Sequence, residues 1–214
     1  MDATPRLPQL SLRIDNVTLT RGEFDLFENL SAMLTPGEAL VLKGANGAGK
    51  SSALLALAGQ LPIKSGEIQW LGLGKEEAAD SQMHLIGHLP AIQRGLTVRE
   101  NLAFWTALYD GDEAILDSAI AAAGLSGLEH LSCSVLSAGQ TRRLALARLV
   151  AIPRPIWLLD EPTSALDAEG SLWVETLIGA HLAAGGLAVI ATHLALGIER
   201  EPNVKVKTLS EFTL

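Results

Sequence analysis

A glycine-rich octapeptide before residue 52 has the residue types and spacing that bind phosphate groups. It matches the pattern G-x-x-x-x-G-K-[ST] without a gap and reads Gly44-Ala45-Asn46-Gly47-Ala48-Gly49-Lys50-Ser51. Glycines let backbone N–H groups approach phosphate oxygens, Lys50 can reach the β- and γ-phosphates, and the Ser51 hydroxyl can coordinate Mg²⁺. The octapeptide, continued by Ser52, therefore predicts a site for Mg-ATP or a related nucleotide. Kinases, GTPases and ATPases share such a loop, so it does not by itself define the reaction.

Two carboxylates, Asp160 and Glu161, follow the apolar segment 156–159. A buried strand would deliver Asp160 to the end of a sheet, where it can support Mg²⁺ through the metal's water shell. Glu161 would then polarise the attacking water as general base. An ordinary acidic turn before Pro162 would give the same local sequence. The phosphate loop upstream favours the catalytic interpretation.

A third segment, Leu136-Ser137-Ala138-Gly139-Gln140, opens an apparent helix about twenty residues before the carboxylates. Ser137 is a suitable N-cap, and a helix N-terminus that bears serine and glycine attracts anions. By itself this is only a Ser-capped helix start. Ser164-Ala165-Leu166-Asp167 follows the carboxylates, and His193 follows the apolar segment 187–192. A lone histidine in that position is usually a solvated loop residue, but here it completes an ordered set.

These residues require strands and helices to position them. Apolar or alternating segments predict strands at residues 10–19, 39–42, 83–87, 156–159, 187–191 and 203–209. Helices are predicted at residues 50–58 and 168–182, and helical signals dominate residues 97–149, where Thr97 and Glu100 form a capping box. The order predicts an α/β fold with helices on a mostly parallel sheet. An α-helical subdomain is expected over about residues 90–149.

Composition bounds the compartment and the partners. The 214 residues are 48% hydrophobic, but no apolar run approaches the ~20 residues that span a bilayer. The first ten residues lack the apolar core of a secretory signal, and the lone Cys133 fits a reducing compartment, so we expect a cytosolic chain. The net charge of −8 argues against nucleic acid as a partner.

The ordered set resembles the ATP-binding cassette family from about residue 10 to residue 209. The resemblance implies one domain over residues 1–214, a P-loop NTPase sandwich with an inserted helical subdomain over about 90–149. It also implies integral membrane partners and an ATP-dependent, head-to-tail homodimer. Each ATP would lie between the phosphate loop of one copy and Ser137, Gly139 and Gln140 of the other. His193 would be the switch histidine and would act in catalysis with Glu161.

Two positions depart from the family pattern. Where many members place an adenine-stacking aromatic, this chain has Arg21, with Phe24 and Phe27 nearby. Where the family supplies a glutamine that touches Mg²⁺ and the attacking water, this chain has Ala91. The loop after residue 87 is also short. Gln93 or His88 could replace the glutamine, and the sequence leaves both the replacement and the adenine platform open.

Two features narrow the resemblance to one branch of the family: the shortened loop with Gly87-His88 and the single-glycine motif at residues 136–140. With these features the chain looks like the ATPase subunits of the cytochrome c maturation system, a haem exporter complex of the bacterial inner membrane. This implies a peripheral position at the cytoplasmic face of that membrane and a role in haem export or handling. The helical subdomain and residues 90–96 would contact the membrane subunit.

Three alternatives remain open at this stage. An exporter ATPase for another substrate would carry the same motifs. A non-transport cassette acting on ribosomes or DNA usually has two cassettes or a coiled-coil insertion and favours basic surfaces. A small-molecule phosphotransferase is disfavoured by the segment at residues 136–140 together with Glu161.

Overall fold

A computed structural model of the protein describes residues 7–22, 24–74 and 78–209, whose tertiary contacts fall into two units. The first unit takes the described residues up to Gly87, together with Arg154–Glu161 and those from Val174 onward. The second unit comprises His88–Pro153 and Pro162–Trp173. The first unit is built on β-sheets and the second on helices.

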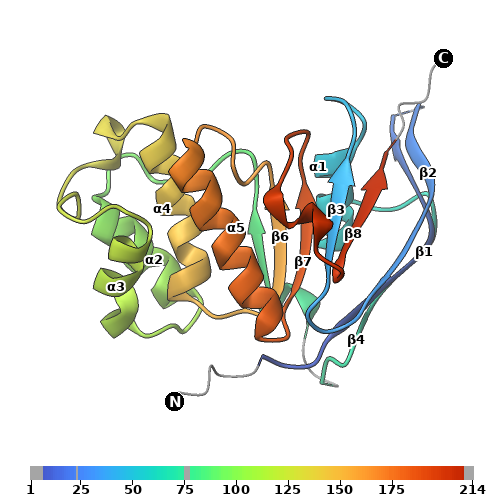
Figure 1. The fold of residues 1–214 in the computed structure, drawn as a ribbon, viewed down its shortest axis with the longest axis horizontal. Coiled ribbons are helices and arrows are strands. Elements are labelled where there is room, and N and C mark those ends of the chain that lie inside the picture. The colour runs from blue at the N-terminus through green and yellow to red at the C-terminus, as the bar shows by residue number, and fades with distance from the viewer. Residues whose placement is uncertain (1–6, 23, 75–77, 210–214) are drawn as a thin grey trace. The chain divides into compact units, whose positions relative to one another are not determined.

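A five-stranded parallel sheet is the centre of the first unit. Its order is β5-β6-β7-β3-β8, and Figure 1 shows the arrowheads of β3, β5 and β8 pointing the same way. The strands are β3 (Ala39–Lys43), β5 (Met83–Ile86), β6 (Ile156–Asp160), β7 (Leu187–Ala191) and β8 (Val204–Thr208). Every residue of β6 and β7 is buried, as expected for central strands covered on both faces.

A second, three-stranded sheet pairs antiparallel in the order β2-β1-β4. Its strands are β1 (Ser11–Arg21), β2 (Phe24–Leu34) and β4 (Ser65–Leu71). β1 alternates buried Leu12 and Ile14 with exposed residues, the pattern of a sheet with one wet face. The sequence analysis anticipated β1 but not β2, β4 or this separate sheet.

Helix α1 (Lys50–Leu57) shares one apolar core with both sheets. Leu54 and Leu57 of the helix belong to the same buried cluster as Leu12 of β1, Leu40 of β3 and Leu158 of β6. Figure 1 places α1 beside β3, on the side of β1 and β2. This packing fixes the start of α1, and with it the loop that precedes it.

The last part of helix α5 (Ala168–Ala183) covers the parallel sheet through an aromatic contact. The imidazole of His181 stacks on the Trp157 indole of β6 with ring centroids 3.8 Å apart. The His181 Nε2 atom lies 3.1 Å from the Leu187 carbonyl at the start of β7. Burial lowers the pKa of His181 to about 4, so the ring is neutral at physiological pH.

The second unit gathers three helices around a core that includes Leu102, Ile120 and Leu144. They are α2 (Val98–Leu108), α3 (Leu116–Ala122) and α4 (Ala138–Ala151). Thr97 and Glu100 form the expected capping box at the start of α2.

Besides these helices and strands, the two units contain short 3₁₀ turns: η1 (Ala79–Gln82), η2 (Glu113–Ile115), η3 (Cys133–Val135) and η4 (Gly197–Arg200).

The predicted α/β fold class is confirmed, and each predicted strand is present to within two residues at either end. The helix predicted at residues 168–182 is α5. Among the described residues, no helix combines the length and apolar character needed to cross a membrane.

Gly186 provides a test of the packing beside β7. A Cβ atom there would lie 2.2 Å from the His181 Cε1 and Nε2 atoms, and the Trp157 stack leaves that ring little room to move. We expect Gly186→Ala to lower the free energy of unfolding by about 1–3 kcal/mol in urea denaturation. Gly179→Ala is the control, because its Cβ meets nothing within 4 Å; it should raise stability by about 0.5–1 kcal/mol. Equal stability of Gly186→Ala and wild type would show that this contact is not tight.

Candidate nucleotide-binding site

The predicted phosphate loop connects the end of β3 to the start of α1. Gly44, Gly47 and Gly49 have φ angles of 142°, 95° and 86°, a region that side-chain-bearing residues rarely adopt. Ala45, Asn46 and Gly47 are exposed at the tip of the loop, whereas Ala48 is buried at its base. The loop therefore presents backbone outward from a fixed base.

Two glycines at the base of the loop are required by close neighbours. A Cβ at Gly44 would lie 2.6 Å from the Leu209 carbonyl oxygen. A Cβ at Gly49 would lie 2.9 Å from the Leu26 Cβ and 3.1 Å from the ring of Phe27. Larger residues at either position would displace the loop.

The Lys50 ammonium is held inside the loop. Its Nζ atom donates hydrogen bonds to the carbonyl oxygens of Gly44 and Ala45, each at 2.8 Å, and the residue is 6% exposed. The position encloses the cation with backbone oxygens and keeps it pointed along the loop. A bound polyphosphate would supply stronger, charged acceptors at the same place.

The N-terminus of α1 is not closed by a side chain. The N-cap residue is Gly49, so no N-cap side chain accepts a hydrogen bond from the first turn, and that turn contains no acidic residue. Ser51 is exposed and Ser52 is half-buried in that turn. The free N–H groups and the positive end of the helix dipole favour an anion there.

The carboxylates follow β6 at the same edge of the parallel sheet as this loop. Asp160 pairs in register with Ala191 of β7, and Leu42 of β3 pairs with Ala191 on the other side. Because all three strands are parallel, their carboxyl ends carry Asp160, Thr192 and the phosphate loop to one edge. Asp160 is 5% exposed.

Glu161 has a special backbone and a fully engaged side chain. Its φ angle is 47°, and its N–H donates to the Ala191 carbonyl at 2.7 Å. The Oε2 atom accepts from the Thr192 hydroxyl at 2.8 Å. The Oε1 atom accepts from the His193 backbone N–H at 3.1 Å and lies 2.7 Å from the His193 Nδ1 atom. The structure thus brings Glu161 and His193 together.

Burial and hydrogen bonding act in opposite directions on Glu161. Burial is the largest single influence and by itself raises the pKa of the carboxyl. The hydrogen bonds from His193 and Thr192 together outweigh it, so the net pKa lies below the usual value. The group is therefore an ionised carboxylate at physiological pH.

Thr192 is a site residue that the sequence analysis missed. It is fully buried, and its hydroxyl donates to Glu161 while accepting from the Leu194 N–H at 3.0 Å. The only signal in the sequence is a hydroxyl residue between an apolar strand and His193. That pattern is common at strand ends and does not indicate a partner thirty residues upstream.

In the second unit, Ser137 and Gln140 form a reciprocal capping box at the start of α4. The Ser137 hydroxyl accepts from the Gln140 N–H at 3.2 Å, and the Gln140 Oε1 atom accepts from the Ser137 N–H at 2.9 Å. Ser137 remains exposed, so its hydroxyl hydrogen can reach a ligand. A Cβ at Gly139 would lie 2.9 Å from the Ala165 carbonyl oxygen.

The loop at residues 88–96 is anchored through its backbone. The buried Asn101 of α2 accepts from the Gln93 N–H at 2.8 Å and donates to the Gln93 carbonyl at 2.9 Å. The side chains of His88 and Gln93 are exposed, and Ala91 has a φ angle of 52°. Either polar side chain is available for contact with a ligand or partner.

Two of the three candidate residues for an adenine platform, Arg21 and Phe27, have described side chains, and of these two Arg21 is the one open to a base. Phe27 is 3% exposed and packs beneath Gly49, so it supports the phosphate loop and offers no face to a base. The side chain of Phe24 lies outside the described part of the chain. Arg21 is exposed at the end of β1, where its guanidinium is free to stack on a ring.

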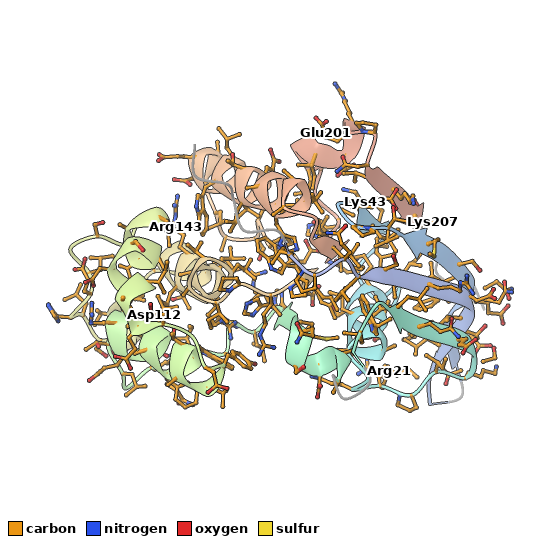
Figure 2. The ribbon with its side chains drawn as sticks, turned by 90° about the horizontal axis from the view of Figure 1, so that it is seen from below. Arg21, Lys43, Asp112, Arg143, Glu201 and Lys207 are labelled. Carbon is orange, nitrogen blue, oxygen red and sulfur yellow. The ribbon has the colours of Figure 1, made fainter. Side chains whose placement is uncertain are left out.

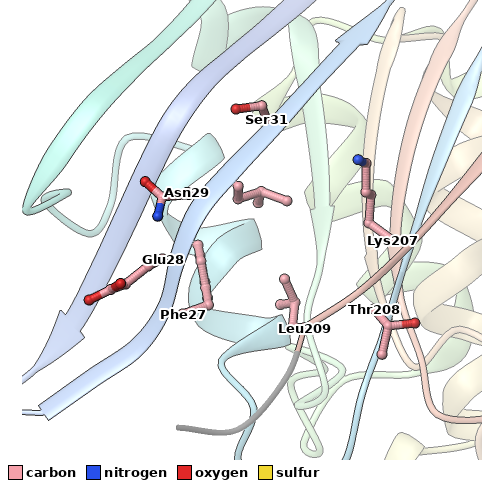
Figure 3. A pocket seen from close by; sticks show the side chains of 8 residues that line it. Phe27, Glu28, Asn29, Ser31, Lys207, Thr208 and Leu209 are labelled. Atoms are coloured by element: carbon pink, nitrogen blue, oxygen red, sulfur yellow. The ribbon is translucent and has the colours of Figure 1, made fainter.

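A hollow of about 320 Å³ lies between β2 and the end of β8. Figure 3 shows the Phe27 and Leu209 side chains among those that line it, with Glu28 directed away from them. Phe27 and Leu209 are also the residues that approach Gly49 and Gly44. Two of the residues that line this hollow therefore also support the phosphate loop from beneath.

The fold and this arrangement are those of a P-loop nucleotide-binding ATPase. Residues 27–164 match the family model described as ABC transporter. The chain belongs to the ABC transporter family. The predicted family is therefore confirmed.

Relatives of high similarity carry one name. A protein of Rhodopseudomonas palustris (strain BisB18) named "Cytochrome c biogenesis ATP-binding export protein CcmA" is 48% identical over 83% of this chain and 89% of its own length. A protein of Nitrobacter winogradskyi with the same name is 46% identical over the same shares. The namesake from Agrobacterium fabrum is 40% identical over 92% of this chain and 95% of its own length.

Solved structures of more distant proteins share the fold. An ABC transporter ATP-binding protein from Pyrococcus furiosus, described as putative, superposes with a TM-score of 0.80 at 21% identity, over 93% of this chain and 97% of its own. A bacterial Atm1-family ABC exporter with ATP bound gives a TM-score of 0.79 at 20% identity, over all of this chain and 40% of its own.

Replacement of Lys50 tests the phosphate loop. Lys50→Ala should abolish measurable ATP binding in titration calorimetry, because the ammonium is the loop's own counter-charge to the phosphates. Circular dichroism should stay that of wild type, since only loop carbonyls lose a partner. Wild-type affinity in this variant would contradict the assignment of the loop.

Replacement of Glu161 separates binding from hydrolysis. Glu161→Gln keeps an acceptor oxygen for His193 but cannot take a proton from water. We expect ATP affinity to stay within about threefold of wild type, while turnover falls by about 10²-fold or more. The readout is phosphate release at saturating ATP. A rate equal to wild type would mean that another group is the base.

Proposed function

We propose that this chain binds and hydrolyses Mg-ATP and so powers a membrane complex for cytochrome c biogenesis, by exporting or handling haem. The observation that carries the biological role is the 46–48% identity to proteins named for cytochrome c biogenesis export. The observation that carries the chemistry is Glu161, an ionised carboxylate at the edge of the sheet that also carries the phosphate loop.

The residues present fit a hydrated Mg²⁺ held mainly by the nucleotide. Among the described residues, no cluster of three or more His, Cys, Asp or Glu side chains could cage a metal alone. Ser51 offers an exposed hydroxyl at the helix start, and Asp160 offers a carboxylate at the end of β6. These two residues would hold the ion together with phosphate oxygens and water, as Mg²⁺ prefers. Bound Mg²⁺ would neutralise charge on the β- and γ-phosphates.

Different residues of the chain then act in different parts of the reaction. The loop N–H groups and Lys50 hold the phosphates, and Glu161 accepts a proton from the attacking water. The water oxygen bonds to the γ-phosphorus as the bond to the β–γ bridging oxygen breaks, which gives ADP and phosphate. His193, held beside Glu161, positions the water and the γ-phosphate.

A second copy of the chain would complete each site. The exposed Ser137 and the start of α4 form an anion-binding helix end with no phosphate loop in its own unit. We therefore propose an ATP-dependent, head-to-tail homodimer. In it, Ser137, Gly139 and Gln140 face the γ-phosphate that is bound to the other copy.

The membrane subunit would dock on the second unit. A hollow of about 480 Å³ there is lined by residues of the 88–96 loop and of the 133–141 segment. Leu89 is 81% exposed and Val135 is 68% exposed, which is unusual for large apolar side chains. An apolar segment of an integral membrane subunit fits this surface, and docking there would place the chain at the cytoplasmic face of the inner membrane.

The biological role is tested in cells. Deletion of the gene should remove haem-bound c-type cytochromes from a haem-stained membrane fraction, and wild type but not Lys50→Ala should restore them. Normal cytochrome c in the deletion strain would point to an exporter of another substrate.

We also predict that the isolated chain hydrolyses ATP about 10²-fold more slowly than the assembled complex. Ala91 has no side-chain oxygen for Mg²⁺ or the water, and one positioned polar contact is commonly worth that much in rate. Docking onto the membrane subunit could bring the exposed Gln93 or His88 into the position that the family's glutamine occupies. The measurement is phosphate release by the purified chain and by the reconstituted complex.

Two matched variants of the complex, Gln93→Ala and His88→Ala, identify which side chain replaces the family's glutamine. Hydrolysis should slow only in the variant that lacks the replacing side chain. If the free chain is as fast as the complex, the coupling proposal is wrong. If neither variant slows the complex, the site works without a glutamine equivalent.

A further inference from the structure

Lys43 is the last residue of β3 and directly precedes the phosphate loop. Its side chain leaves the loop and reaches the segment that follows β7. The Nζ atom donates a hydrogen bond to the Leu194 carbonyl and lies 2.5 Å from the Glu199 Oε1 atom of η4. Figure 2 labels Lys43 at the end of β3. The Lys43 side chain is only 17% exposed, so its contacts are shielded from solvent.

The segment that Lys43 reaches carries two donors to Glu161. Thr192 and His193 both bond the Glu161 carboxylate, and Leu194 is the next residue. Lys43 therefore binds the backbone one residue beyond His193. It is a side-chain connection between the base of the phosphate loop and the segment that holds the catalytic carboxylate, in addition to the backbone bond that the Thr192 N–H donates to the Leu42 carbonyl at 3.1 Å.

The rest of the segment is braced from the other direction. Glu199 accepts from the Leu196 N–H at 2.6 Å, and Glu175 of α5 accepts from the Gly197 N–H at 2.7 Å. Glu199 is thus shared between Lys43 and the backbone of its own segment. Loss of the ammonium would leave a partly buried carboxylate and a carbonyl without their cation, and this favours opening of the segment.

A second lysine makes the same kind of contacts at the other end of the sheet. The Lys205 Nζ atom donates to the Met33 carbonyl at 2.7 Å and pairs with Glu38 at 2.8 Å. Lys205 stands near the start of β8, and Glu38 precedes β3, so this pair lies at the amino ends of the strands. It touches no residue of the nucleotide site and provides a matched control.

We propose that Lys43 is a positioning residue for ATP hydrolysis: it holds residues 192–200 so that His193 keeps its place beside Glu161. This inference rests on the proposed hydrolysis of ATP. Lys43 itself touches neither Glu161 nor the phosphate loop's binding groups. Its effect should therefore appear in the hydrolysis rate and pass through His193, with ATP binding unchanged.

The test compares Lys43→Met with Lys205→Met in the purified full-length chain. Hydrolysis in a single turnover, with the protein in excess over ATP, should slow on the order of 10–100-fold in Lys43→Met and stay near wild type in Lys205→Met. ATP affinity by calorimetry should be equal in both. Hydrogen exchange of the amides of residues 194–197 should accelerate only in Lys43→Met, since only there is the segment released.

A double-mutant cycle separates positioning from general destabilisation. In a His193→Ala background, Lys43→Met should cause almost no further loss, because a residue that acts through His193 has nothing left to position. An equal loss in both backgrounds would overturn the proposal, and so would a wild-type rate or a weakened ATP affinity in Lys43→Met. If Lys43→Met does not fold, Glu199→Gln serves instead and should slow hydrolysis in the same direction. Failure of the complex reconstituted with the wild-type chain to hydrolyse ATP would count against the proposed function itself.

Discussion

Parallel pairing of β3, β6 and β7 is the constraint on which the rest of the site depends. Each strand is five residues long, and their registers place Leu42, Ala191 and Asp160 side by side. The chain must therefore leave all three strands at one edge, where it forms the phosphate loop, Glu161 and Thr192 in turn. A slip of one residue in β6 would turn Asp160 to the other face and bury Glu161 in its place. Complete burial of β6 and β7 makes such a slip costly.

The pKa of the Glu161 carboxyl depends on two opposing effects, burial and hydrogen-bond donors. Removal from water alone would favour the neutral acid, which cannot accept a proton. Donors on Thr192 and His193 reverse that preference and keep the carboxylate charged. Both donors come from one short segment, so the ionisation of this proposed base and its position are controlled together. A displacement of that segment would change the hydrogen bonding of the carboxylate and its orientation at once.

Local features of this fold and its mostly parallel sheet could be predicted from the sequence, whereas individual long-range contacts could not. The phosphate loop and both capping boxes depend on residues within eight positions of each other, and their patterns are specific. β2 was missed because its apolar residues are interrupted by Glu28 and by Asn29, which has a φ angle of 55° at an irregularity of the pairing. Thr192 and Lys43 act on partners about thirty and one hundred and fifty residues away. No spacing rule reveals such contacts.

The motif at residues 136–140 shows why a single pattern is weak evidence of function. Ser137 and Gln140 satisfy each other in the capping box, and Gly139 is small because the Ala165 carbonyl lies close by. Each residue would be favoured for stability alone, with no nucleotide present. The segment that supplies that carbonyl is itself braced, since Arg143 pairs with Asp167 at 3.3 Å. The contacts at the start of α4 thus form without a ligand, and a preformed, exposed helix end can bind an anion at a small entropic cost. Structural and functional demands coincide at these residues, so only the ordered combination with the phosphate loop and Glu161 distinguishes a nucleotide site from a well-capped helix.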